Sequence, residues 1–255
     1  MNTVKVAGLK ENEFIKQSIM ALPILYSLRN CPYAMRARIA IFKSHQAVAL
    51  RDLVLTNKPA AMLLASPKGT VPILVLNEIN LSADDKSAGG QANVIDESLD
   101  VMLWALNESD PHDLLHRRKN ADEEPNNVLA EMLALITDFD VEFKVRLETY
   151  KCAKRYHETT IDECREACEH YIQILESRLI QHDYLFSARE SLADIALLPF
   201  IRQFARIERQ WYLQAPYPQL QKWLNRYLQS PMFTKVMAKH PLWLESGEEV
   251  IFVGK

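Results

Sequence analysis

The stretch LRNCPYAMRAR, residues 28–38, places Cys31 directly before a proline and an aromatic residue, at the start of a basic helical pattern. Proline suits the first turn of a helix, where backbone N–H groups have no partner within the helix. Those N–H groups and the helix dipole stabilise an anion, and cysteines so placed have pKa values of about 3.5 to 7.5 instead of about 8.5. Arg29 and Arg36 lie within about a turn. The sequence therefore predicts a reactive thiolate at Cys31, and the alternative is an inert cap residue.

Two further motifs carry groups that recognise a peptide. Val71-Pro72 opens a strand, and a cis bond there leaves the Val71 N–H and C=O to pair with an extended ligand. In the segment DES, Ser98 as N-cap offers a hydroxyl and helix N–H groups to a carboxylate, and Glu97 suits an ammonium group. Ordinary helix capping explains each residue of this pair alone. Together with a thiolate and a strand edge, they suit a small zwitterionic peptide thiol.

Alternating strands and helices must position these motifs. Hydrophobic patterning between Leu22 and Leu106 predicts the order β-α-β-α-β-β-α. The expected strands are 22–28, 48–55, 71–77 and 92–97, and the expected helices are 32–45, 58–66 and 98–109. The polar stretch 77–91 is longer than a hairpin needs and is expected to be an exposed excursion.

The second half of the chain has helical patterns only, apart from its tail. Apolar residues recur at helical spacing through 129–143 and 164–180, and Ser191 with Asp194 forms a capping box before an apolar run. The charged segment between Pro111 and Pro125 reads as a linker. We therefore expect an α+β protein with domains at 22–108 and 126–242, joined by 109–125.

Composition excludes several classes of function. The chain has 255 residues and a net charge of -3, and its only dense basic run is HRRK at 116–119, so a nucleic-acid partner is not expected. No apolar run approaches the roughly 20 residues that cross a bilayer, and the charged start does not resemble a signal peptide, which predicts a cytoplasmic protein without a membrane partner. The four cysteines have no disulfide or zinc spacing, and no metal is expected. The nearest approach to a metal cluster is Cys164 and Cys168 with His157 and His170.

The motifs in order resemble a known family. They are the Cys31 corner, TNKP at 56–59, VPIL at 71–74, DES at 96–98 and SLADIALLPF at 191–200. This series resembles the glutathione transferases, most closely the omega class with its active-site cysteine, over about Leu22 to His240. The resemblance implies a thioredoxin-like N-terminal domain, an all-helical C-terminal domain and a homodimer. The first twenty residues and the 77–91 insertion have no counterpart in the family core.

The resemblance also implies roles for individual residues. Cys31 takes the catalytic position, and Tyr33 stands beside it. Glutathione would be bound by Leu55 and Lys58 in the groove, Val71 through its main chain, Pro72 as the cis-proline, and Glu97 with Ser98 at the γ-glutamyl end. Glutathione is therefore the expected substrate, and no metal is implied.

A cysteine favours one reaction of this family over the other. Conjugating transferases donate a hydrogen bond from serine or tyrosine to the glutathione thiolate, whereas an ionised Cys31 attacks a mixed disulfide. Ala34 stands where glutaredoxins have a second cysteine, so only a monothiol route is open. The alternatives are conjugation through the Tyr26 or Ser27 hydroxyl and a non-catalytic role binding a partner such as RNA polymerase. The second substrate is a small or protein disulfide, or an electrophile.

Overall fold

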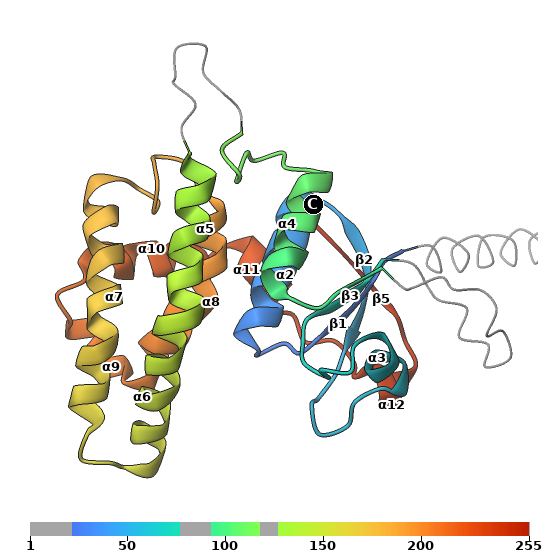
Figure 1. Ribbon diagram of the computed structural model, residues 1–255, viewed down its shortest axis with the longest axis horizontal. Coiled ribbons are helices and arrows are strands. Elements are labelled where there is room, and N and C mark those ends of the chain that lie inside the picture. Colours follow the sequence, from blue (N-terminus) through green and yellow to red (C-terminus); the bar gives the residue numbers. More distant parts are fainter. Residues whose placement is uncertain (1–21, 77–92, 118–126, 255) are drawn as a thin grey trace, which may run out of the picture. The chain divides into compact units, whose positions relative to one another are not determined.

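The computed structural model describes residues 22–76, 93–117 and 127–254. These residues form two compact units (Figure 1). The first combines the chain up to Ser109 with Met237 onward, and the second is Asp110–Val236. The N-terminal twenty residues and the expected excursion at 77–91 lie outside the described residues.

The first unit is built on a mixed five-stranded sheet in the order β4-β3-β1-β2-β5. Its strands are β1 Ile24–Ser27, β2 Ala47–Asp52, β3 Ile73–Val75, β4 Val94–Ile95 and β5 Val250–Val253, and its helices are α2 Pro32–Ser44, α3 Ala60–Ala65, α4 Ser98–Glu108 and α12 Trp243–Ser246. The central strand β1 is parallel to β2 and antiparallel to β3, with Leu25 opposite Leu50 and Leu74. The predicted order of elements up to residue 109 is confirmed wherever the structure describes it.

Strand alternation gives the sheet two apolar faces. Ile24, Tyr26 and Ile73 point to one face, where Met62 of α3 and Trp243 of α12 pack with them. Helices α2 and α4 lie side by side along the sheet (Figure 1). The three inner strands β1, β2 and β3 are buried almost throughout, whereas the edge strands β4 and β5 are mostly half-buried.

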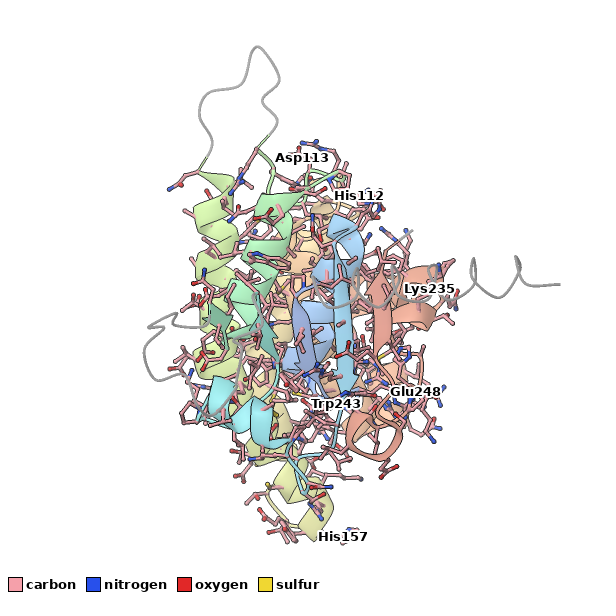
Figure 2. The ribbon with its side chains drawn as sticks, turned by 90° about the vertical axis from the view of Figure 1, so that its right-hand side faces the viewer. His112, Asp113, His157, Lys235, Trp243 and Glu248 are labelled. Carbon is pink, nitrogen blue, oxygen red and sulfur yellow. The ribbon has the colours of Figure 1, made fainter. Side chains whose placement is uncertain are left out.

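The C-terminal segment adds an edge strand that lies far along the chain from its partner. Strand β5 pairs antiparallel to β2, and Arg51 of β2 donates from Nε to Glu249 Oε1 at 2.9 Å. The Arg51 guanidinium carbon lies 4.3 Å from the centroid of the Trp243 ring. The segment that carries Trp243 and Glu248 can be followed in Figure 2. It closes the edge of β2 that would otherwise expose unpaired backbone groups.

The second unit is helical wherever the structure assigns regular elements. Its helices are α5 Val128–Asp138, α6 Lys144–Tyr156, α7 Ile161–Gln181, α8 Leu192–Ile207, α9 Arg209–Gln214, α10 Pro218–Leu228 and α11 Pro231–Val236. A π-helical turn, η1 at Phe139–Phe143, joins α5 directly to α6. The helix expected over 129–143 is thus longer than predicted, and both end residues of the π turn are buried. None of the described helices is both long and apolar enough to cross a bilayer.

The predicted capping box opens α8. The Ser191 side chain accepts from the Asp194 N–H, and Asp194 Oδ2 accepts from the Ser191 N–H at 3.0 Å. Asp194 Oδ1 also accepts from the Leu185 N–H and from Trp223 Nε1 at 2.8 Å. One fully buried carboxylate therefore ties α8, α10 and the preceding loop together.

Gly254 provides a test of the edge strand. A Cβ at this position would lie 1.7 Å from the Phe42 carbonyl oxygen, far inside any allowed contact. We therefore expect Gly254→Ala to displace β5, so that amide hydrogen exchange at 250–253 becomes fast while β1 keeps its protection. Glu248→Ala, an exposed change in the same segment, should leave both rates unaltered. Unchanged protection of β5 in Gly254→Ala would contradict this packing.

Candidate active site

Cys31 is the N-cap of α2, with Pro32 in the first turn, as predicted. Its backbone is extended (φ -74°, ψ 124°), and its N–H donates to the Leu28 carbonyl at 3.1 Å. The side chain makes no capping hydrogen bond and is partly exposed. Because the first turn of α2 holds no acidic residue, nothing there neutralises the positive end of the helix dipole. The Cys31 sulfur is therefore accessible at the N-terminal end of α2.

Val71 lies next to that sulfur. The Val71-Pro72 peptide bond is cis, and the Cys31 Sγ lies 3.8 Å from the Val71 carbonyl oxygen, to which the thiol donates. The loop before β3 thus meets the corner after β1, although the two residues are 40 positions apart. The structure brings together the predicted nucleophile and the predicted backbone contact for a peptide.

The two alternative hydroxyls are held elsewhere. The Tyr26 side chain is 2% exposed, and its hydroxyl accepts from Arg51 Nη1 at 2.9 Å. Ser27 is fully buried, and its Oγ accepts from Arg38 Nε at 2.7 Å. Since both groups are enclosed and engaged with arginines, the structure does not support either as a donor to a bound thiolate.

Glu97 and Ser98, the pair expected to bind the γ-glutamyl end and called the clamp below, differ in detail from the prediction. Ser98 is the first residue of α4 and Glu97 is its N-cap, so the assignment of Ser98 as the N-cap is wrong. The sequence locates a helix end only to within a residue or two, and the Glu97 side chain makes no capping hydrogen bond that would mark it. Ser98 is 4% exposed, and its Oγ accepts from Arg36 Nε at 2.9 Å. Arg36 was expected near the thiol, and no motif indicated its contact with Ser98.

The exposed Lys68 side chain pairs with the two neighbouring carboxylates of Asp96 and Glu97. Lys68 Nζ pairs with Glu97 Oε1 and lies 3.3 Å from Asp96 Oδ1. The Ser66 hydroxyl donates to Asp96 Oδ2 at 2.7 Å and, with Lys68, holds the pKa of that carboxyl below its ordinary value. Glu97 is thus exposed and already paired with the ammonium group of Lys68. No sequence signal pointed to Lys68.

Leu55 and Lys58 lie on a separate turn after β2. Leu55 is 43% exposed at the tip of a turn closed by the Asn57 N–H and the Val54 carbonyl at 3.2 Å. Lys58 extends along the segment before Val71, since a Cβ on Gly69 would stand 3.0 Å from its Nζ. Lys58 is therefore close in the fold to the loop of Val71, whereas Leu55 lies at the exposed tip of the turn.

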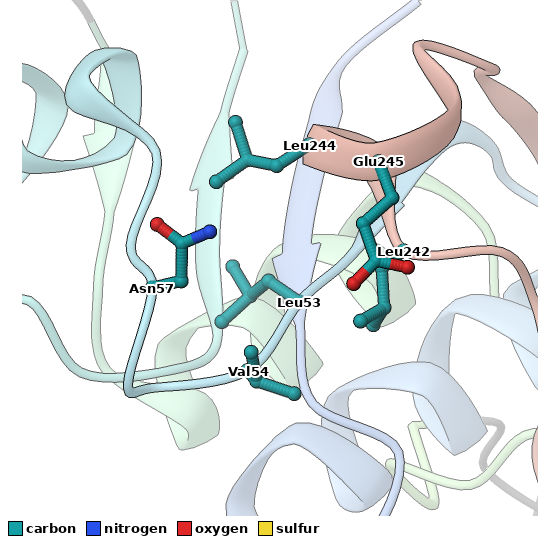
Figure 3. A pocket seen from close by; sticks show the side chains of 6 residues that line it. All are labelled: Leu53, Val54, Asn57, Leu242, Leu244 and Glu245. Carbon is teal, nitrogen blue, oxygen red and sulfur yellow. The ribbon is translucent and has the colours of Figure 1, made fainter.

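A small, open pocket lies between this turn and the C-terminal segment (Figure 3). Its lining residues are Leu53, Val54, Asn57, Leu242, Leu244 and Glu245. None of the predicted site residues lines it. The pocket is therefore formed where the turn packs against the C-terminal segment, and it is separate from the predicted site at Cys31.

Tyr33 is partly buried in the first turn of α2, and the Arg36 guanidinium carbon lies 5.3 Å from its ring centroid. Of the two cysteines considered as metal ligands, Cys168 is fully buried, and burial raises the pKa of its thiol to about 12, whereas Cys164 is half-buried. Within the described ranges, no three histidine, cysteine or acidic side chains gather as metal ligands would.

Comparison with known proteins identifies both domains. Residues 25–112 match the family model of the glutathione S-transferase N-terminal domain, and residues 134–231 match that of the C-terminal domain. No curated protein matches the chain.

Solved structures share the fold at low sequence identity. A glutathione transferase family member from Pseudomonas fluorescens, with two glutathione molecules bound, is 16% identical with a TM-score of 0.67, covering 86% of this chain and 93% of that one. Glutathione transferase Omega 2C from Trametes versicolor is 20% identical with a TM-score of 0.65, covering 86% and 94%. Glutathione S-transferase-I with lactoylglutathione is 19% identical with a TM-score of 0.64, covering 85% and 99%. With its thioredoxin-like N-terminal domain and helical C-terminal domain, this chain belongs to the glutathione S-transferase family.

Proposed function

We propose that the protein is a glutathione-dependent thiol transferase that reduces glutathione mixed disulfides through Cys31, as omega-like members of the family would. The observation that carries the proposal is the partly exposed Cys31 sulfur at the N-terminus of α2, beside the Val71 carbonyl. The engagement of Tyr26 and Ser27 with arginines supports a cysteine rather than a hydroxyl mechanism. The glutathione bound in a structural relative agrees with the proposed ligand.

The reaction balances with two glutathione units. The Cys31 thiolate attacks the glutathionyl sulfur of a mixed disulfide, a Cys31–glutathione disulfide forms, and the other thiol leaves as a thiolate that takes a proton from water. A second glutathione thiolate then attacks this disulfide, which releases oxidised glutathione and restores the Cys31 thiolate. Ala34, fully buried one turn on, supplies no second sulfur, so the return step depends on free glutathione.

Glutathione recognition would use the groups around that sulfur. Val71 pairs its backbone with the cysteinyl residue, Lys58 meets the glycyl carboxylate, and Glu97 with Ser98 holds the γ-glutamyl end. Tyr33, Leu55 and Pro72 complete the walls of the groove. A reducing cytoplasm supplies the second glutathione, and the protein would act there as a homodimer.

Assays of the wild-type protein distinguish thiol transfer from conjugation and from a non-catalytic, partner-binding role. Glutathione binding should be measurable by titration calorimetry, and the protein should reduce the mixed disulfide of glutathione and 2-mercaptoethanol. Conjugation of a chloronitrobenzene without disulfide reduction would indicate a conjugating enzyme. Absence of glutathione binding would indicate a partner-binding member of the fold.

The ion pair between Lys68 and Glu97 predicts an effect on the affinity for the glutamyl ammonium group. Because Lys68 holds Glu97 in the free protein, Lys68→Met should free that carboxylate and tighten glutathione binding about two- to fivefold, the range typical of exposed ion pairs. Glutaryl-cysteinylglycine, which is glutathione without its ammonium group, should bind both proteins equally. Weaker binding of glutathione to Lys68→Met would show that Lys68 contacts the ligand instead of competing with it.

A further inference from the structure

Arg36 joins the helix of Cys31 to the glutamyl clamp. It is the fifth residue of α2, is 2% exposed, and donates from Nε to Ser98 Oγ, 62 positions along the chain, at 2.9 Å. Helices α2 and α4 pack along each other, so this hydrogen bond lies in their interface. The α2 helix thus carries both the predicted nucleophile at its first turn and a cation that reaches the start of α4.

The direction of this hydrogen bond decides what Ser98 can do. A guanidinium group donates only, whereas a serine hydroxyl both accepts and donates. Because a guanidinium cannot accept, the Ser98 hydroxyl that accepts from Arg36 can donate its own hydrogen only to some other group. The buried Arg36 charge and the N-terminal end of α4 add a positive potential at the same place, which Asp100 in the first turn and the exposed Glu97 partly offset.

We propose that Arg36 is a positioning residue for carboxylate recognition, which orients the Ser98 hydroxyl as a donor to the α-carboxylate of a γ-glutamyl peptide. This rests on the proposed glutathione ligand. Arg36 acts through Ser98 and does not touch the reacting sulfur atoms. Its contribution is therefore to affinity for one group of the ligand and not to the exchange of disulfides.

Two peptide analogues separate the groups of the glutamyl end. In 4-aminobutyryl-cysteinylglycine only the α-carboxylate is missing, and in glutaryl-cysteinylglycine only the ammonium group is missing. Titration calorimetry of the full chain in reducing buffer should show that the wild type prefers glutathione over both. In Arg36→Met, the preference over the aminobutyryl peptide should fall about tenfold or more, as expected for a lost charge-assisted hydrogen bond. The preference over the glutaryl peptide should remain.

A double-mutant cycle shows whether Arg36 acts through Ser98. The double variant Arg36→Met with Ser98→Ala should bind glutathione within about twofold of Ser98→Ala alone, since coupled residues are not additive. Arg36→Lys, which retains a cationic donor, should recover part of the carboxylate preference. It also carries the test if circular dichroism shows that Arg36→Met does not fold.

Several results would overturn the inference. Equal weakening of all three ligands would mean that Arg36 only supports the fold, and an undiminished carboxylate preference in the Arg36 variants would remove its positioning role. Additive effects in the double variant would separate Arg36 from Ser98. A wild type that binds no glutathione would overturn the proposed function together with this inference, whereas the other results leave the function standing.

Discussion

Cys31→Ser should lose mixed-disulfide reduction by about a thousandfold or more, since a serine hydroxyl cannot form the protein–glutathione disulfide on which turnover depends. Glutathione binding should stay within about twofold of the wild type, because the Val71 backbone, Lys58 and the Ser98 clamp are unchanged. The new hydroxyl should also donate to the glutathione thiolate and give weak conjugation of a chloronitrobenzene. The measurements are initial rates with each substrate and calorimetric titration with glutathione.

Cys152→Ser is the matched control for this variant. Cys152 is the exposed cysteine among the four, lies on α6 and has no part in the proposed site. Its replacement should leave both the reduction rate and glutathione binding unaltered. Full thiol-transfer activity in Cys31→Ser would refute Cys31 as the nucleophile, and loss of activity in Cys152→Ser would move the chemistry to the helical unit.

Asp194→Ala should give the largest loss of stability, about 2 to 4 kcal/mol for the helical unit. The change leaves the Trp223 indole N–H and the backbone N–H groups of Leu185 and Ser191 buried without their acceptor. This exceeds the roughly 0.5 to 2 kcal/mol of an ordinary helix cap, because the carboxylate also bonds two groups outside the capping box. Denaturant unfolding followed by Trp fluorescence measures the loss. A change below about 0.5 kcal/mol would contradict the assigned network.

The charge of Asp194 gives that experiment a pH-dependent control. Burial raises its pKa from 3.8 to about 6, so ionisation costs more in the folded than in the unfolded protein. The wild type therefore loses stability from this group as the pH rises from about 4 to about 6, and Asp194→Asn has no such titration. The stability advantage of wild type over Asp194→Asn should narrow across that window. A widening advantage would mean that the folded state favours the ionised form.

Local signals predicted much of this fold. Pro32 after Cys31 and the pair Ser191 with Asp194 mark helix starts that the structure places at those residues. The pairing of strands that are far apart in the sequence was not predicted. Strand β5 meets β2 across about 200 residues, held by Arg51 and Glu249, and no short window of sequence encodes that choice of partner. The π turn at Phe139–Phe143 was also missed, because its apolar spacing fits an ordinary helix.

In the candidate site too, local motifs were predicted and the contacts between distant residues were not. The corner at Cys31 and its closeness to Val71 follow from motifs whose chemistry is visible in the sequence. The partners of long side chains do not, since Arg36 could equally have turned toward the thiol as toward Ser98. Tyr26 looked like a possible hydroxyl donor for a related reason, because only the fold shows which arginine it meets.

A single turnover without free glutathione tests the central claim most directly. The wild-type protein is mixed with the disulfide of glutathione and 2-mercaptoethanol, quenched with acid at increasing times, digested and analysed by mass spectrometry. We expect one glutathionyl group on Cys31, formed as 2-mercaptoethanol is released, and its loss as oxidised glutathione when glutathione is added. A glutathionyl group on Cys152 or Cys164, a hydroxyethylthio group on Cys31, or an adduct that glutathione does not remove would contradict the proposed mechanism.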